Sequence, residues 1–182
     1  VDPMFGAGRD YLENLLVDAG LLVQTINGTR DPYFGGLPPD PAPTHLNDLV
    51  NRVKGDDRIV LGLATDGDAD RYGIIDADGS FIEPNYILAL LYDYLLRHGR
   101  NGDAARSVAT SHFIDAVAAH HGHSVRETPV GFKHFGPLFV DGSLEFAGEE
   151  SAGLTWANLL GVKDGVRTMG VFKILEVVPL VL

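Results

Sequence analysis

The chain has 182 residues, of which 45% are hydrophobic and 21% are charged, and this balance is typical of a globular protein rather than a disordered one. Its formal net charge of −11 argues against nucleic acid and against an anionic membrane as partners, because both attract positive charge. No stretch of the sequence approaches the roughly 20 consecutive apolar residues of a membrane-spanning helix.

The sequence contains no cysteine, which excludes a disulfide framework, a thiol nucleophile and a thiolate zinc site. The first residues do not have the basic and apolar segments of a secretory signal. These features lead us to expect a cytoplasmic protein. The start at Val1 and the apolar stretch over 177–182 lead us to expect an excised piece of a longer protein.

Helix and strand patterns alternate along the chain. In chain order, the first part predicts a helix over 8–19, a strand over 21–26, a Gly- and Pro-rich loop over 27–42, a helix over 44–53, strands over 59–64, 72–76 and 80–82, and a helix over 84–97. After the polar stretch over 98–105, the pattern predicts a strand over 107–110, a helix over 111–121, strands over 123–127 and 143–147 around a loop and helix over 131–140, and a helix over 164–178. This alternation predicts an α/β fold, with domains at 1–103 and 104–182.

The most informative segment is an acidic loop between two predicted strands. Asp66, Asp68 and Asp70 are spaced two residues apart, so that in extended backbone their side chains point to one side, about 7 Å apart. A bend at Gly67 can bring them to a common point. Three neighbouring carboxylates repel one another and require a cation. Oxygen ligands without His or Cys favour Mg²⁺, Ca²⁺ or Mn²⁺ over zinc.

Other interpretations of this loop are a solvated turn and a calcium-binding EF-hand. Asp and Gly are common turn residues, so the first interpretation stays open. An EF-hand requires Gly and Glu at the positions of Arg71 and Ala77, and it is therefore excluded. Arg71 is either an ion-pair partner of the aspartates or a phosphate contact beside the metal.

Two further segments have the residue types of a ligand site. In Gly148–Gly153, Glu149 and Ser151 alternate and can offer a carboxylate and a hydroxyl to the hydroxyls of a sugar, although a solvated acidic loop is the simpler interpretation. In the segment 128–135, Pro129 and Gly131 shape a turn before Lys133. That lysine is either a surface residue or a proton-transfer group, and we expect His134 to be structural.

These segments together resemble one family. Asp66-Gly67-Asp68-Ala69-Asp70-Arg71 resembles the metal-binding loop of the α-D-phosphohexomutases, the phosphoglucomutase and phosphomannomutase superfamily, in which Gly usually stands at the position of Ala69. Gly148–Gly153 is similar to the sugar-binding loop of this family, in a form closer to phosphoglucomutases. The segments 1–8, 31–41 and 128–135 also resemble parts of the second and third domains of the family.

The resemblance implies a fold and a reaction. It implies two similar three-layer α/β domains with mixed sheets: a metal-binding domain at 1–103 and a sugar-binding domain, truncated at its end, at 104–182. The implied parent enzyme interconverts hexose 1-phosphate and hexose 6-phosphate through a phosphoserine and a hexose 1,6-bisphosphate, which also serves as activator. The catalytic serine and a substrate-phosphate site belong to the first and fourth domains. These are the missing partners of this chain, which we therefore expect to be inactive alone.

The resemblance also implies roles for single residues. Asp66, Asp68 and Asp70 would bind one Mg²⁺ ion, and Arg71 would contact a phosphate of the enzyme or substrate. Lys133, Glu149 and Ser151 would contact the phosphosugar. Lys133 is also the candidate for proton transfer. A His found in some relatives at the position of Gly153 is replaced here.

Two other functions compete with this one. The chain can be a non-enzymatic module that binds metal or sugar, or a metal-dependent phosphohydrolase in which one aspartate of the acidic loop is the nucleophile. Three further patterns have structural explanations. We expect Ser111 to cap a helix and the histidines at 120, 121 and 123 to lie at a solvated helix end. The sequon Asn27-Gly28-Thr29 has no meaning without secretion.

Overall fold

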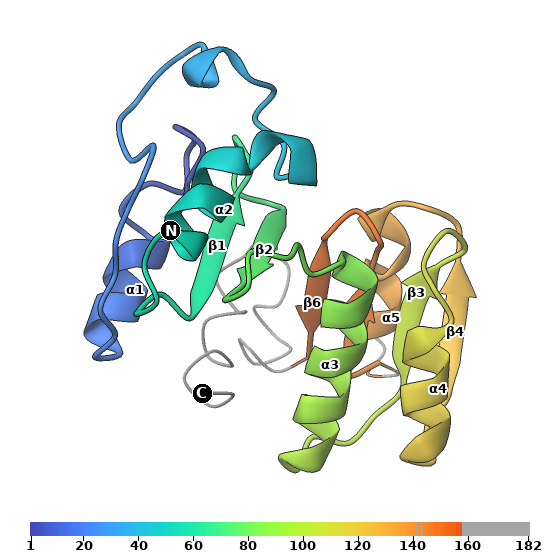
Figure 1. Cartoon of the computed structure of the whole chain (residues 1–182). Coiled ribbons are helices and arrows are strands. Elements are labelled where there is room, and N and C mark those ends of the chain that lie inside the picture. Colours follow the sequence, from blue (N-terminus) through green and yellow to red (C-terminus); the bar gives the residue numbers. More distant parts are fainter. Residues whose placement is uncertain (141, 143, 158–182) are drawn as a thin grey trace. The chain divides into compact units, whose positions relative to one another are not determined.

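The computed structural model describes residues 1–140, 142 and 144–157 of the chain. The chain folds into two compact units, one formed by Val1–Ile82 and the other beginning at Glu83. Each unit combines helices with strands (Figure 1), and the predicted α/β class is confirmed. Among the described residues, no helix is both long enough and apolar enough to cross a membrane.

The first unit is built around a short sheet. Its elements are α1 (Leu12–Asp18), the 3-10 helices η1 (Phe34–Gly36) and η2 (Pro43–His45), α2 (Asn47–Lys54), β1 (Leu61–Thr65) and β2 (Tyr72–Asp76). β1 and β2 pair antiparallel, with Leu61 opposite Asp76. Asp2 forms a parallel bridge with Ala64 of β1. β1 therefore has an antiparallel partner in β2 and a parallel contact with the N-terminal segment.

The core of the first unit forms where α2 covers the strands. Leu46 and Leu49 are buried and Val50 is partly buried, as the apolar periodicity of this helix predicted. They pack with Met4 and Ile75 in one hydrophobic cluster. The buried face of α2 therefore holds the N-terminal segment and β2 in one core, and this core supports the loop between β1 and β2.

The second unit contains a four-stranded mixed sheet. Its elements are α3 (Pro84–Arg97), β3 (Ala104–Ser107), α4 (Phe113–His120), β4 (Val125–Thr128), η3 (Phe132–His134), α5 (Gly136–Val140), β5 (Phe146–Gly148) and β6 (Leu154–Trp156). The strand order is β4-β3-β5-β6. β3 is parallel to both β4 and β5, and β6 is antiparallel to β5.

Side chains alternate between the two faces of this sheet. Because helices pack against both faces, the unit has three layers. On one face, the ring of Phe146 stacks on Tyr92 of α3, with centroids 5.5 Å apart. On the other face, Ala105 and Ala147 pack with Phe135, which lies between η3 and α5. Figure 1 shows α3 and α4 on one side of the sheet and α5 on the other. The predicted α/β/α layering is thus present in this unit.

The structure divides the chain between Ile82 and Glu83, whereas the sequence predicted the boundary after residue 103. Helix α3 is part of the second unit, where Tyr92 stacks on β5 and its hydroxyl donates to the backbone oxygen of Gly102 over 2.7 Å. The polar stretch over 98–105 therefore joins α3 to β3 inside one unit. Composition does not distinguish such a surface loop from a linker between domains.

The segment 21–26 was predicted as a strand, but it forms none in the structure. Two hydrogen bonds join it to Val1: the terminal ammonium donates to the backbone oxygen of Gln24 over 2.7 Å, and the Ile26 N–H donates to the Val1 oxygen over 2.9 Å. A cavity of about 380 Å³, lined by residues of this segment and of β1, lies between them. The segment therefore lacks the strand neighbour that would complete its ladder.

Other predicted elements have shifted ends. β3 ends at Ser107, where the sequence predicted that a strand would begin, because the chain turns there with the Thr110 N–H donating to the Ser107 oxygen over 3.0 Å. The strand predicted over 80–82 consists of one antiparallel bridge between Ile75 and Phe81. β6 was not predicted, since three residues are too few to show a period. The predicted helix over 164–178 lies outside the described residues.

Candidate functional site

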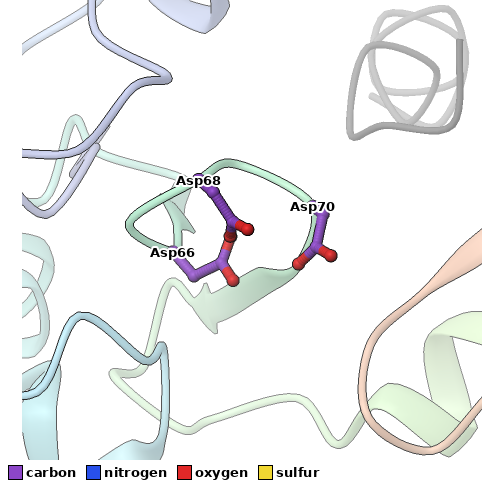
Figure 2. Close-up of side chains that lie close together, drawn as sticks. All are labelled: Asp66, Asp68 and Asp70. Atoms are coloured by element: carbon purple, nitrogen blue, oxygen red, sulfur yellow. The ribbon is translucent and has the colours of Figure 1, made fainter.

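The acidic loop gathers its three carboxylates at one point. Asp66, Asp68 and Asp70 each offer an oxygen atom, and these oxygens all lie within 4.8 Å of one another. Figure 2 shows the three side chains converging from one turn of backbone between β1 and β2. Asp66 is 1% exposed, while Asp68 and Asp70 are open to solvent. The site is therefore anchored at one carboxylate and accessible at the other two.

Backbone hydrogen bonds give the loop this shape. The Asp66 N–H donates to the Arg71 oxygen over 3.3 Å and closes the loop where the strands end, and the Ala69 N–H donates to the Asp66 oxygen over 3.2 Å. Ala69 has a φ of +63°, a left-handed conformation that an alanine adopts only at an energetic cost. This residue turns the chain so that Asp68 and Asp70 face Asp66.

Two distant segments support the loop from outside. The Ala7 N–H donates to the Gly67 oxygen over 2.8 Å, and the Gly67 N–H donates to the Pro39 oxygen over 3.0 Å. A Cβ atom at Gly6 would lie 2.7 Å from the Gly67 oxygen and 2.9 Å from the Asp66 oxygen. The glycine at residue 6 is thus required by the close approach of two backbones. The N-terminal segment 1–8 and the Pro-rich segment 31–41 therefore meet at this loop.

Arg71 is the cation of the loop. Its backbone N–H and its Nε donate to the two carboxylate oxygens of Asp66 over 3.0 and 3.1 Å. Its guanidinium also lies 3.6 Å from Asp40 and 3.6 Å from Asp70. Asp40 belongs to the Pro-rich loop, and sequence reasoning gave it no role because no local spacing links it to residue 71. Arg71 is therefore paired with acidic side chains in the structure, while 44% of its side chain stays exposed.

The electrostatics of the loop are those of excess negative charge. Burial, followed by the neighbouring carboxylates of Asp70 and Asp68, raises the pKa of Asp66 from 3.8 to about 6, against the lowering effect of the Arg71 N–H. Burial and the two neighbouring acids thus both disfavour the ionised form of Asp66. A divalent cation would supply the missing positive charge.

The donor set fits a hard cation. All three groups are carboxylates, which Mg²⁺ and Ca²⁺ prefer. Three oxygens on one Mg²⁺ cannot all lie opposite one another, so oxygens spread within 4.8 Å would have to move closer together to bind the ion at about 2.1 Å. In the part of the chain that the structure describes, this is the one group of His or acidic residues that could hold a metal ion.

In the second unit, the loop between β5 and β6 forms a tight turn. The Glu149 N–H donates to the Gly153 oxygen over 2.9 Å, and the Ala152 N–H donates to the Glu149 oxygen over 3.1 Å. Ala152 has a φ of +70°. The Glu149 side chain is 6% exposed, whereas Ser151 is exposed. The two residues that were expected to point to one side therefore differ in access to solvent.

The turn lies beside the segment that contains Lys133. The backbone N–H of Gly131 donates to Oε1 of Glu149 over 2.6 Å, and a Cβ atom at Gly153 would lie 2.7 Å from the ring of Phe132. Lys133 itself is exposed on η3. The structure thus brings together the two predicted sugar-contacting segments, which are far apart in the sequence.

Sequence reasoning missed how Glu150 is held. Its Oε2 accepts hydrogen bonds from the hydroxyls of Ser107 and Thr110, each over 3.1 Å, and its N–H donates to the Thr110 hydroxyl over 3.2 Å. Ser107 is fully buried and Thr110 is 4% exposed. These two hydroxyl residues are the first and last of the strand predicted over 107–110, and their partner lies 40 or more residues further along the chain.

The other sequence patterns have structural roles. Ser111 Oγ accepts a hydrogen bond from the Phe113 N–H over 3.2 Å, but the capping residue of α4 is His112 and not Ser111 as predicted. His121 contacts Asp93 over 2.7 Å and His123 lies 3.6 Å from Asp103. These two histidines are therefore paired with carboxylates, and not simply solvated as predicted.

Comparison with known proteins assigns both units to one family. Residues 1–79 match the family model described as phosphoglucomutase/phosphomannomutase, alpha/beta/alpha domain II, and residues 83–178 match the model of alpha/beta/alpha domain III. The chain belongs to the phosphoglucomutase/phosphomannomutase family. The two units of the structure correspond in sequence to these two family domains.

Individual relatives agree with this family. The chain is 36% identical to phosphoglucomutase 1 of Drosophila melanogaster over 91% of its own length and 30% of that protein. It is 33% identical to the phosphoglucomutase/phosphomannomutase of Thermococcus kodakarensis over 97% and 38% of the two lengths. The structure of a putative phosphomannomutase from Thermus thermophilus matches with a TM-score of 0.79 at 34% identity, covering 85% of this chain and 36% of that one. The chain thus spans about a third of the length of these relatives.

Proposed function

We propose that this chain supplies the metal-binding and sugar-binding parts of a phosphoglucomutase-type isomerase that interconverts hexose 1-phosphate and hexose 6-phosphate. In this proposal the phosphoryl group passes through a phosphoserine and a hexose 1,6-bisphosphate, and the serine lies in a domain other than II and III. The chain alone then binds metal and phosphosugar without mutase turnover. The observation that carries the proposal is the convergence of Asp66, Asp68 and Asp70 in a chain of this family.

In the first unit, the acidic loop has two tasks. Asp66, Asp68 and Asp70 would hold Mg²⁺, which neutralises charge on a transferring phosphoryl group when bound. Arg71 orients Asp66 through two hydrogen bonds, and its exposed guanidinium can donate to a phosphate oxygen. The loop would therefore present a cation and a hydrogen-bond donor to the same phosphate.

In the second unit, three side chains would bind the phosphosugar. The exposed hydroxyl of Ser151 can donate to and accept from a sugar hydroxyl. The ammonium of Lys133 can contact a phosphate or transfer a proton. Glu149 accepts from the Gly131 N–H with one oxygen, and we assign its second oxygen to a sugar hydroxyl. Because Glu149 bonds to the segment of Lys133, it also orients that segment.

Calorimetric titration of the chain with MgCl₂ tests the metal site. We expect saturable binding that weakens by about tenfold or more in Asp68→Asn, since one of three charged ligands is lost. Asp57→Asn is the matched control, because it removes the same charge from an exposed position of the same unit. Equal affinities in wild type, Asp68→Asn and Asp57→Asn would refute the metal site.

Activity and sugar-binding assays beside the MgCl₂ titration separate the isomerase from the two competing functions. A phosphohydrolase with an aspartyl nucleophile predicts that Asp66→Asn and Asp68→Asn differ sharply in phosphate release, whereas ligand roles predict a similar loss of Mg²⁺ affinity in both. Robust conversion of glucose 1-phosphate by the purified chain would contradict the proposal that it acts only as part of a larger enzyme. Tight, sugar-specific binding without any link to phosphate would favour a non-enzymatic module.

A further inference from the structure

Two consecutive glutamates of the turn between β5 and β6 accept hydrogen bonds from two different segments of the second unit. Glu149 Oε1 accepts from the Gly131 N–H over 2.6 Å, while Glu150 Oε2 accepts from the hydroxyls of Ser107 and Thr110 at the end of β3. The turn is therefore tied on one side to the segment of Lys133 and on the other side to β3. Ser151, the next residue, is the exposed one.

The contacts of Glu150 hold the turn in place, and we call this set of contacts with Ser107 and Thr110 the anchor. An ionised carboxylate accepts hydrogen bonds only, and each hydroxyl has one proton to donate. Ser107 and Thr110 can both donate to Oε2, while the Thr110 oxygen accepts the Glu150 N–H over 3.2 Å. Side chain and backbone of Glu150 are thus held by one buried threonine. Hydrogen bonds to a charged group are stronger than neutral ones, and burial of the two hydroxyls shields them from water.

We propose that Thr110, assisted by Ser107, is a positioning residue that fixes the Glu149–Gly153 turn through Glu150 and so sets the place of Ser151. This inference rests on the proposed function only for the sugar that Ser151 would contact. It assigns Glu150 to the support of the turn and not to the sugar.

Thr110 makes more contacts with Glu150 than Ser107 does. Thr110 contacts both the carboxylate and the amide of Glu150, whereas Ser107 contacts the carboxylate and the Thr110 hydroxyl, 2.9 Å away. Replacing Thr110 by valine keeps the shape of the side chain but removes both contacts. Thr110→Ser keeps the hydroxyl and should restore them.

Amide hydrogen exchange of the full chain, followed by NMR, tests the anchor. We expect Thr110→Val to raise exchange at the amides of Glu149, Ala152 and Gly131 by about tenfold, the effect of losing one hydrogen bond to a charged group. Thr110→Ser should exchange like wild type. Ser124→Ala, an exposed hydroxyl removed just before β4 begins, is the control. Unchanged exchange in Thr110→Val, or faster exchange throughout both parallel strand pairs of the sheet, would overturn the proposal.

A second readout concerns the sugar and separates the two proposals. Titration with glucose 6-phosphate should shift the Ser151 amide signal of wild type, Thr110→Ser and Ser124→Ala, and Thr110→Val should bind about tenfold more weakly. If wild type shows no shift while the exchange results hold, the sugar-binding function fails and the anchor stands. If Thr110→Val binds the sugar like wild type, Thr110 does not position Ser151 and the inference is wrong.

Discussion

Arg71 engages both carboxylate oxygens of Asp66, with its backbone N–H 3.0 Å from Oδ1 and its Nε 3.1 Å from Oδ2. A metal ion at the acidic loop must therefore share this carboxylate with a guanidinium. The two positive charges repel each other, but both are attracted to a phosphate. Under the proposed function, we therefore expect the loop to bind the cation more tightly together with a phosphate than alone.

The first prediction concerns Arg71→Gln. At about pH 8, where Asp66 with its pKa of about 6 is ionised, we expect the variant to bind Mg²⁺ about two- to fivefold more tightly. The reason is the removal of a neighbouring positive charge, worth roughly 0.5–1 kcal/mol for a partly exposed pair. Calorimetry with MgCl₂ measures this change. Arg58→Gln is the control, since Arg58 pairs with Asp56 in the same unit, and weaker binding in Arg71→Gln alone would contradict the prediction.

The second prediction concerns Gly6→Ala. The added methyl group would lie 2.7 Å from the Gly67 oxygen, and backbone atoms cannot yield as a flexible side chain does. We expect the free energy of unfolding to fall by about 1–3 kcal/mol and Mg²⁺ affinity to fall with it, because the loop must move. Urea unfolding and calorimetry measure the two effects. Gly136→Ala, at the start of α5 where a Cβ meets no atom within 4 Å, should lower neither quantity.

Elements with a strong local signal were predicted with correct bounds. The helix over 84–97 has a proline at its first position and an apolar face, and the strand over 72–76 lies between turn residues. The structure has both elements with the predicted bounds. The segment 21–26 has a strand-like composition but no paired neighbour over most of its length. A strand requires a partner, and a partner distant in sequence leaves no trace in local periodicity.

The candidate site shows the same division. The convergence of Asp66, Asp68 and Asp70 could be predicted because all three lie in one short loop, and the structure brings them together. Their roles as metal ligands stay a prediction. The contacts of Asp40 with Arg71 and of Thr110 with Glu150 could not be predicted, since each depends on how distant segments pack.

The third prediction concerns Ala69→Gly. Ala69 has a φ of +63°, a conformation that costs a residue with a Cβ about 1–2 kcal/mol. Glycine removes this cost but increases the entropy of the unfolded chain by about 0.5–1 kcal/mol. We expect the variant to gain up to about 1 kcal/mol in the free energy of unfolding, as measured with urea. Ala77→Gly, at a turn position without a positive φ, should instead lose stability, and a loss of the same size in both variants would show that Ala69 is unstrained.

The fourth prediction is a pH dependence at Asp2. Burial raises the pKa of Asp2 above 3.8, against the lowering effects of hydrogen bonds from the Met4 N–H and from Asn27. The folded chain therefore keeps this proton to a higher pH than the unfolded chain does. By linkage, the contribution of Asp2 to the free energy of unfolding is largest below the unfolded pKa of 3.8 and is lost as pH rises through its folded pKa.

Asp2→Asn removes this titration, while its side-chain oxygen can still accept from the Met4 N–H. The stability of the variant relative to wild type should therefore increase from about pH 4.5 to about pH 7.5. Urea unfolding at the two pH values measures this difference. Asp10→Asn, at an exposed position of the same segment, should show no such trend. A relative stability of Asp2→Asn that stays constant or decreases with pH would mean that the carboxylate of Asp2 is not disfavoured by its burial.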